Sequence, residues 1–385
     1  MSNRFFAYAF AMLLCLNLVV VGQSAPPNAS SFAITDPAQV DEDYAFQGEY
    51  IGDISDVSFG QRAAGLQVIA RGDNAFEAVL LSGGLPGAGW DRNSRPQLTG
   101  EREGGTLNLV NDNYKIAVDG QVALVRDAAG VQVGTLRKIN RISPTLGATA
   151  PGNATILFDG TSVENLEGGK IGDDGYLLVG SSTKDAVQDF RLHIEFRLPY
   201  MPYAKGQQRG NSGVYIQRRY EVQVLDSFGL EGVENECGGL YRQQRADVNM
   251  CFPPLRWQTY DIYFRAARFD AEGKKSENAR ITVFHNGVAI HYNRDIKTKT
   301  GAGRPEAPEP LQIHFQNHSN PVFFQNMWII PGDHSAPVTE TGCLPTNFAS
   351  FASESASAGT SSNCVLRCDA APACRTPRRA NCCRR

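Results

Sequence analysis

The sequence predicts an all-β protein made of two parts, a small β-rich module followed by a larger sandwich of two antiparallel sheets. Glycine (38) and proline (20) are frequent among the 385 residues, which favours short strands and turns. Several segments alternate between apolar and polar residues, whereas stretches with a helical period are hard to find. The pairs Asp119-Gly120 and Asn286-Gly287 suit tight hairpin turns between such segments.

The first residues have the composition of an export signal. Arg4 precedes an almost unbroken apolar run over 5–22, and small residues at 22–24 suit a signal peptidase. Residues 1–25 are therefore predicted to be a signal peptide, and the protein to be exported to the periplasm or the extracellular space. The alternative is an uncleaved anchor, because the run approaches the minimum length of a membrane span, about 17 residues. No other run is that long, so we expect no membrane span after cleavage.

The N-terminal half is predicted to hold a linker, residues 26–42, and a small β-rich accessory domain, residues 43–146. Its candidate strands are 65–71, 76–81, 106–110, 114–118 and 122–127. We expect its small core to be built from Ile116, Val118, Val122 and Leu124. Because little chemistry is concentrated in this unit, we interpret it as an accessory module.

A second linker, residues 143–153, leads into the large domain, residues 154–331, whose strands alternate cleanly. Between Arg191 and Leu198 the even-numbered residues are apolar, and the odd-numbered ones are Arg, His, Glu and Arg. This period of two, with a rich polar side, predicts antiparallel sheets that have one face in water. Two such sheets stacked on their apolar faces form a sandwich.

Polar and aromatic side chains gather on the predicted wet face of this domain. They are Tyr215, Gln217, Glu221, Gln223, Gln312, His314 and Gln316. Sugars need this combination, since their hydroxyl groups require paired donors and acceptors and their ring C–H faces stack on aromatic rings. The plainer interpretation is that each one simply faces solvent. Taken together, with few lysines and many glutamines, they favour the lining of a groove.

The segment from Glu221 to Asp226 is the sharpest local pattern. In a regular strand these two residues face opposite sides, but one β-bulge would place both carboxylates on the same face. Concanavalin-like laminarinases carry a similar acidic–x–acidic–x–x–acidic motif on a bulged strand. Here Gln223 occupies the middle position, which departs from that motif.

An ordered set of motifs spans the large domain. It comprises Leu157-Phe158-Asp159-Gly160, Asn211-Ser212-Gly213-Val214-Tyr215, Tyr220 to Ser227, Cys237-Gly238-Gly239-Leu240-Tyr241, Pro253 to Tyr263 with Trp257, Ile281 to Gly287, Leu311-Gln312-Ile313-His314, and Val322 to Pro331. In this order the motifs resemble the 3-keto-disaccharide hydrolase family, formerly described only as a domain of unknown function. The resemblance implies a concanavalin-like jelly roll and a hydrolase that acts on glycosidic bonds.

The resemblance also implies a particular chemistry. A ketone at C3 of a sugar makes the C2 proton acidic, so a base can remove it, the enolate can expel the C1 substituent, and water then adds back. On this basis we expect Glu221 to act as base or acid, Asp226 as its counterpart, and His314 or Arg218 to polarise the ketone. The expected substrate-binding residues are Asn211, Tyr215, Gln217, Arg218, Gln223 and Gln312.

Other functions remain open at this point. Since the same sandwich often serves lectins, a non-catalytic carbohydrate-binding module is the main alternative. A structural surface protein is another, with the Cys-rich tail at 335–385 as a cross-linker. Cys237 and Cys251 are either a disulfide or two buried thiols.

The sequence also bears on partners and cofactors. The net charge of −3 argues against nucleic acid as a partner. No cofactor is required and no metal ligands are assigned, although concanavalin-like folds are known to take a divalent metal such as calcium. The expected partner is a carbohydrate, and the oligomeric state is left open.

Overall fold

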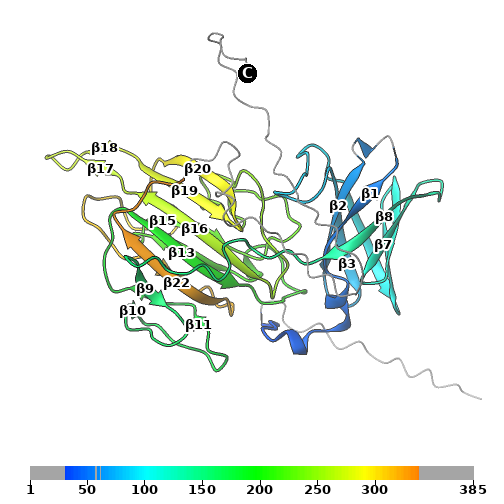
Figure 1. Cartoon of the computed structure of the whole chain (residues 1–385), viewed down its shortest axis with the longest axis horizontal. Helices are drawn as coiled ribbons and strands as arrows, with labels where there is room; N and C mark the ends of the chain where they lie inside the picture. Colours follow the sequence, from blue (N-terminus) through cyan, green and yellow to red (C-terminus); the bar gives the residue numbers. More distant parts are fainter. Residues whose placement is uncertain (1–30, 57–58, 61, 338–385) are drawn as a thin grey trace, which may run out of the picture.

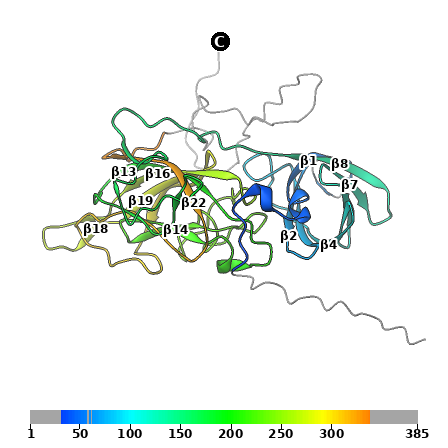
Figure 2. The ribbon, with the colours of Figure 1, turned by 90° about the horizontal axis from the view of Figure 1, so that it is seen from below.

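The computed structural model describes residues 31–56, 59–60 and 62–337, which form a β-barrel and a β-sandwich lying side by side (Figure 1, Figure 2). The predicted all-β fold, with an antiparallel sandwich behind a smaller β-rich module, is confirmed. The predicted signal peptide and nearly all of the Cys-rich tail lie outside the described residues. Within the described part of the chain, no helix has the length and hydrophobicity needed to span a bilayer.

The first unit is a closed barrel of eight antiparallel strands, in which β1 pairs with both β2 and β8. The strands are β1 (Gly48–Ile54), β2 (Ala63–Ala70), β3 (Ala75–Ser82), β4 (Gln97–Glu103), β5 (Thr106–Val110), β6 (Tyr114–Val118), β7 (Val122–Asp127) and β8 (Gln132–Ile139). Inward-facing side chains such as Tyr50, Leu66, Leu107 and Val125 are buried and pack against one another. The interior is therefore a filled core.

The predicted core of this unit is half right. Ile116 and Val118 are buried inside the barrel, but Val122 and Leu124 are only partly buried, and Ala123 and Val125 point inward instead. The register explains the difference, because Ile116 pairs with Val125 and residues that are paired across two strands share a face. A shift of one residue exchanges the two faces of a strand.

The second unit is the sandwich. Its five-stranded sheet has the order β10 (Leu166–Glu167), β12 (Ser182–Thr183), β21 (His314–Phe315), β14 (Ser212–Ile216) and β15 (Tyr220–Val224). Its seven-stranded sheet has the order β11 (Leu177–Leu178), β22 (Phe323–Pro331), β13 (Phe190–Arg197), β16 (Trp257–Arg265), β19 (Ala279–His285) and β20 (Val288–Ile296), with β9 (Thr155–Phe158) paired to β22. The expected apolar sets, among them Val214, Val222, Ile313 and Ile194, are fully buried between the sheets.

Short elements complete the chain. They are the 3-10 turns η1 (Pro37–Gln39), η2 (Glu42–Ala45) and η4 (Gly206–Gln208), and the ribbon of β17 (Arg268–Phe269) and β18 (Lys275–Glu277). The hairpin predicted at Asn286-Gly287 joins β19 to β20. Both of its turn residues have positive φ, 50° and 78°, as the tightest hairpin turns require.

The barrel and the sandwich share their cores. Ile69 of the barrel belongs to the sandwich core and lies against Gly229, while Leu255 of the sandwich belongs to the barrel core. A buried ion pair, Arg141 with Glu49, lies at the junction, and the Arg141 guanidinium also covers the ring of Phe252 at 4.9 Å. The two units are thus held in a fixed arrangement.

The expectation that one face of each sheet lies in water is wrong over much of both sheets. Tyr215, Glu221 and Gln223 on one outer face are buried, as are His193 and Glu195 on the other. Loops explain this burial. Residues 297–305 and 235–244 bond to the backbone of β15 and its adjoining turn, and residues 143–148, called the crossing segment below, lie on the seven-stranded sheet.

Candidate functional site

A row of polar side chains crosses the outer face of the five-stranded sheet. Tyr215 in β14 is paired with Glu221 in β15 and with His314 in β21, and His314 is paired with Ser182 in β12. Paired residues share a face, and neighbouring strands lie about 4.8 Å apart, so the backbones of Glu221 and His314 are about 10 Å apart. We call Ser182, His314, Tyr215 and Glu221 the polar row.

Glu221 lies in an unusual environment for a carboxylate. Its side chain extends over Gly213, where an added Cβ would lie only 2.5 Å from Glu221 Oε1, so only glycine leaves this space. Oε2 is buried and has no hydrogen-bond partner among the described residues. Burial raises the pKa of Glu221 to about 7, and a hydrogen bond with Tyr215 opposes the shift only in part. Near neutral pH this group can therefore both accept and release a proton.

Two loops close over Glu221 and leave it 3% exposed. The Glu221 amide donates to Thr300 Oγ1 at 2.7 Å, and the Tyr241 amide donates to the Glu221 carbonyl at 3.2 Å. Gly301 lies beside both the Tyr241 ring and Glu221 Oε2. The carboxylate is thus held beneath Tyr241 and residues 300–303.

The other end of the row is more open and carries positive charge. Arg218 donates to Ser182 Oγ at 2.8 Å, and His314 Nδ1 lies 2.9 Å from the same oxygen. Both Arg218 and His314 are half-buried. Burial and the neighbouring Arg218 charge lower the pKa of His314, so its imidazole is neutral at pH 7. Arg218 reaches Ser182 from a turn in which it and Gln217 both have positive φ.

Amide side chains lie beside the row. Gln223 donates to Gln207 Oε1 at 3.0 Å, and Asn211 donates to the Gln207 carbonyl at 2.7 Å. The Oδ1 atom of Asn211 and the Oε1 atom of Gln316 are buried without a hydrogen-bond partner among the described residues. Gln312 is half-buried, two residues before His314. Unpaired acceptors of this kind suit the hydroxyl groups of a ligand.

The structure separates Asp226 from the polar row. The sequence allowed Glu221 and Asp226 to share one face only if strand β15 carried a β-bulge. Strand β15 pairs with β14 from Tyr220 to Val224 without a bulge, so this condition is not met along the strand. Asp226 lies beyond the strand end in a buried ion pair with Arg209, at 2.6 Å. Its Oδ2 accepts from Arg209 and its Oδ1 from the Phe228 amide, so this geometry does not support a role in acid–base chemistry at the row.

Gln217 is also used by the fold. Its amide donates to the Val187 carbonyl at 2.7 Å, and its Oε1 accepts from Arg219. The side chain therefore connects two loops and does not face a ligand. Of the expected residues, the structure brings Glu221, Tyr215, His314 and Arg218 together, with Asn211, Gln223 and Gln312 beside them.

Sequence reasoning missed Ser182, Tyr241 and Thr300. Ser182 is 132 residues from His314, and only strand pairing brings them together. Tyr241 belongs to one of the motifs of the resemblance, but no local pattern indicates that it covers Glu221. A short polar side chain in a loop, such as Thr300, carries no signal of its own.

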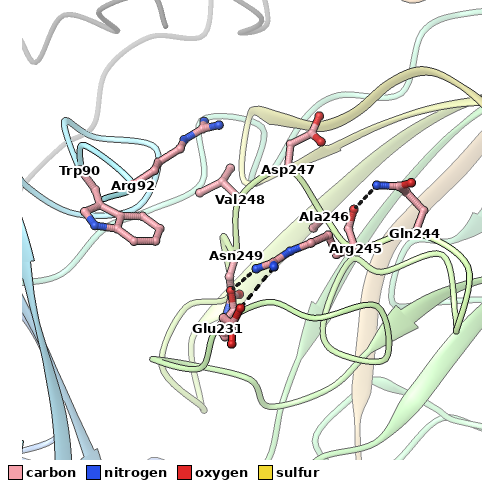
Figure 3. Close-up of a pocket in the computed structure, with 9 residues that line it drawn as sticks. All are labelled: Trp90, Arg92, Glu231, Gln244, Arg245, Ala246, Asp247, Val248 and Asn249. Atoms are coloured by element: carbon pink, nitrogen blue, oxygen red, sulfur yellow. Dashed lines mark hydrogen bonds and ion pairs between the residues drawn. The ribbon is translucent and has the colours of Figure 1, made fainter. Parts of the chain in front are cut away.

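Two cavities lie elsewhere on the molecule. One, of about 300 Å³, lies at the junction of barrel and sandwich (Figure 3), and one of about 380 Å³ lies beside β19, β20 and residues 334–336. Neither is lined by the polar row. In the part of the chain that the structure describes, no three His, Cys, Asp or Glu side chains are grouped to hold a metal ion. Cys237 and Cys251 are buried free thiols.

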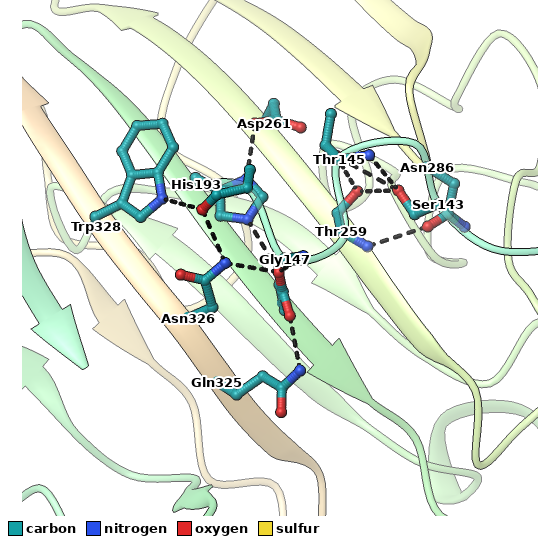
Figure 4. A network of polar contacts seen from close by, with 12 residues as sticks. Ser143, Thr145, Gly147, His193, Thr259, Asp261, Asn286, Gln325, Asn326 and Trp328 are labelled. Atoms are coloured by element: carbon teal, nitrogen blue, oxygen red, sulfur yellow. Dashed lines mark hydrogen bonds and ion pairs between the residues drawn. The ribbon is translucent and has the colours of Figure 1, made fainter. Parts of the chain in front are cut away.

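The seven-stranded sheet carries a second polar cluster, which the crossing segment covers (Figure 4). His193 lies between Asp261, at 2.8 Å, and Glu195, at 3.5 Å, and its ring stacks on Trp328. Gly147 of the crossing segment donates its amide to Glu195. Burial alone would lower the pKa of His193, but the two carboxylates outweigh it and raise the pKa to about 9. This cluster is a sealed network without access for a ligand.

Comparison with known proteins identifies the sandwich. The model of the 3-keto-alpha-glucoside-1,2-lyase-like domain matches residues 153–330. Three solved structures of proposed glycosyl hydrolases from Parabacteroides distasonis are similar to the chain. The first is 32% identical, with a TM-score of 0.44, and covers 48% of this chain and 85% of that one. The other two are 16% and 21% identical, with TM-scores of 0.36 and 0.33, and cover 51% and 46% of this chain and 100% and 98% of theirs. None of the curated proteins matches.

Proposed function

Because the chain belongs, through residues 153–330, to the 3-keto-alpha-glucoside-1,2-lyase-like family, we propose that it is an exported enzyme that cleaves the glycosidic bond of 3-keto-glucosides. The observation that carries the proposal is the polar row, in which a carboxylate with a pKa near neutrality shares one sheet face with a neutral histidine, while Arg218 reaches the same face from the adjoining turn. Export is proposed from the apolar run in residues 1–25 alone.

Glu221 is the proposed base. In a 3-keto-glucoside its carboxylate would take the proton from C2, leaving the electron pair to form an enolate whose negative charge is on the C3 oxygen. Collapse of the enolate breaks the bond between C1 and the glycosidic oxygen and leaves a double bond between C1 and C2. Water then adds its hydroxyl to C1, Glu221 returns its proton to C2, and the remaining water proton replaces the one given to the leaving oxygen, which completes a hydrolysis. A base with a pKa near 7 suits this step at neutral pH.

His314 and Arg218 are the proposed donors to the C3 oxygen. If Ser182 donates to His314 Nδ1, the neutral imidazole carries its proton on Nε2, where it can be donated to the developing enolate. The Arg218 charge would stabilise the same oxygen. Tyr215 lies between this end and Glu221, and because burial raises the pKa of its hydroxyl, it stays protonated and can donate to the leaving oxygen.

Substrate access requires a change in the loop that covers Glu221. The carboxylate is 3% exposed beneath Tyr241 and residues 300–303, so a sugar ring reaches it only if these residues move. The same burial favours one competing function, a non-catalytic carbohydrate-binding module in which Glu221 is purely structural. Only the enzyme, and not the binding module, would turn over a 3-keto-glucoside.

The test is to incubate the purified protein with a 3-keto-disaccharide and to follow the release of monosaccharide. Glu221→Gln should lower kcat by about 10² to 10⁴, the usual contribution of a general base, and should remain folded. Glu236→Gln is the matched control, because Glu236 is another glutamate whose pKa burial raises, yet its carboxylate accepts from the Gly232 and Val233 amides and not from the polar row. Full turnover by Glu221→Gln would remove the assignment, and no turnover by the unmodified protein would favour the binding module.

A further inference from the structure

We propose that the cavity at the junction of barrel and sandwich binds one pyranose ring of a neutral glycan. This junction cavity has a volume of about 300 Å³ (Figure 3). Trp90 and Arg92 of the barrel line one side, and Glu231, Arg245 and Asn249 of the sandwich line the other. Ligand sites are common where two domains meet, and this volume lies at the lower end of their usual range, which suits a single sugar ring.

Trp90 supplies a fixed aromatic surface. Its indole N–H donates to the Ser94 carbonyl at 3.1 Å, and its ring is partly buried against the sandwich core. The remaining face of the ring borders the cavity, opposite the sandwich residues (Figure 3). An indole whose N–H is already bonded presents an apolar surface, which suits the C–H face of a sugar ring.

The facing wall supplies polar groups whose charges are already compensated. Arg245 pairs with Glu231 at 3.2 Å, and Asp247 pairs with Arg294 at 2.8 Å, outside the cavity. The Arg245 and Glu231 side chains are still about half exposed, so they retain free donors and acceptors. Because the pairs cancel, the wall favours a ligand with hydroxyl groups over one with a strong charge. Arg92 at the rim adds one more donor.

The floor is rigid. Val248 and Asn249 are buried, and the Asn249 amide donates to the Ser227 and Leu230 carbonyls. The cavity is thus shaped before a ligand arrives, which lowers the entropic cost of binding. Its wall is continuous with the cover of the polar row, since Leu240 and Gln244 exchange backbone hydrogen bonds and Tyr241 next to them bonds to Glu221. The inference does not depend on the proposed catalytic function.

Isothermal titration calorimetry of the full mature chain, with maltotriose and cellotriose in turn, tests this site. We expect each chain to bind one molecule of at least one of the two trisaccharides. Trp90→Ala should weaken that binding by about tenfold or more, as truncation of a central aromatic group usually does, while Trp90→Phe should retain most of it. Glu221→Gln should bind the trisaccharide as the unmodified chain does, which separates this site from the polar row.

A second variant guards against misfolding. Arg245 is half exposed, so Arg245→Ala should fold normally and bind the trisaccharide several-fold more weakly. Near-UV circular dichroism reports whether each variant keeps its native packing. Equal affinity in the unmodified chain and a folded Trp90→Ala variant would overturn the proposal, as would unchanged affinity in Arg245→Ala. So would the absence of binding of both trisaccharides to the unmodified chain.

Discussion

The two outer faces of the sandwich carry similar residues and serve different ends. Each holds a histidine and a buried glutamate, His193 and Glu195 along one strand of the first sheet and His314 and Glu221 on two different strands of the second. The crossing segment seals the first face, and His193 is 0% exposed. The second face is covered only at the Glu221 end, and His314 stays half-buried. What lies on top of a strand therefore decides whether its polar residues are structural or available.

Charge compensation separates the faces further. Glu195 accepts from Gly147, Gln325 and Asn326 and lies beside protonated His193, and together these outweigh burial and lower its pKa. Glu221 has the Tyr215 hydroxyl as the counterweight to its burial, so its pKa rises. The contacts of Glu195 stabilise its ionised form, whereas Glu221 can gain or lose a proton near neutral pH. Stability should therefore depend on the first face and turnover on the second.

The largest expected effect comes from removing the sealed histidine. His193→Ala would leave Glu195 and Asp261 buried without their cation, and should lower the free energy of unfolding by about 3–5 kcal/mol in urea titrations at pH 6. The folded pKa of His193, about 9, lies above the unfolded value of 6.5, so its contribution is complete below pH 6.5 and is lost as pH rises through 9. The difference between the variant and the unmodified protein should shrink accordingly at pH 10.

The matched change on the other face is His314→Ala. Because His314 is half-buried and bonded only to Ser182 among the described side chains, its removal should cost less than about 1 kcal/mol of stability while turnover falls sharply. Equal stability losses in the two histidine variants would contradict the division between the faces.

An effect smaller than that of His193→Ala is expected from the buried ion pair that holds Asp226. Asp226→Asn keeps the shape of the side chain but leaves the Arg209 guanidinium without its anion, which should cost about 3 kcal/mol of stability. At a temperature where the variant is folded, its kcat on a 3-keto-disaccharide should match that of the unmodified protein. A folded Asp226→Asn variant without turnover would restore the acid–base role expected from the sequence.

The sequence was a good guide to the strands and a poor guide to what covers them. Strict alternation places Val214, Val222 and Ile313 in the core, and the structure agrees, because core burial depends only on the period of a strand. The same alternation makes the opposite faces look wet. Covering loops come from distant segments, such as residues 143–148 and 300–303, and no local pattern reports where they will lie.

The Glu221 to Asp226 motif shows a second limit. Spacing alone could not tell whether a bulge would bring these two carboxylates to one face, and the strand instead ends at Val224. Asp226 then meets Arg209, a residue 17 positions earlier, in an ion pair that only the fold creates. Ser182 was missed for the same reason, since its bond to His314 depends on the pairing of two very short strands.

An effect of the opposite sign, a gain in stability, tests the raised pKa of Glu221 itself. The unfolded pKa of Glu221 is 4.5 and the folded pKa about 7, so the folded state binds more protons than the unfolded state between these values. Stability due to this group is therefore complete below pH 4.5 and falls as pH rises through 7. Glu221→Gln removes the buried charge and should be about 1–2 kcal/mol more stable than the unmodified protein at pH 8, with little difference at pH 4.5.

Urea titrations at both pH values measure this difference in stability. Glu195→Gln is the control, since the Glu195 carboxylate is compensated and its loss should destabilise the protein at pH 8. A Glu221→Gln variant that is less stable at pH 8 would mean that an unseen cation stabilises the carboxylate, and the second face would then resemble the first.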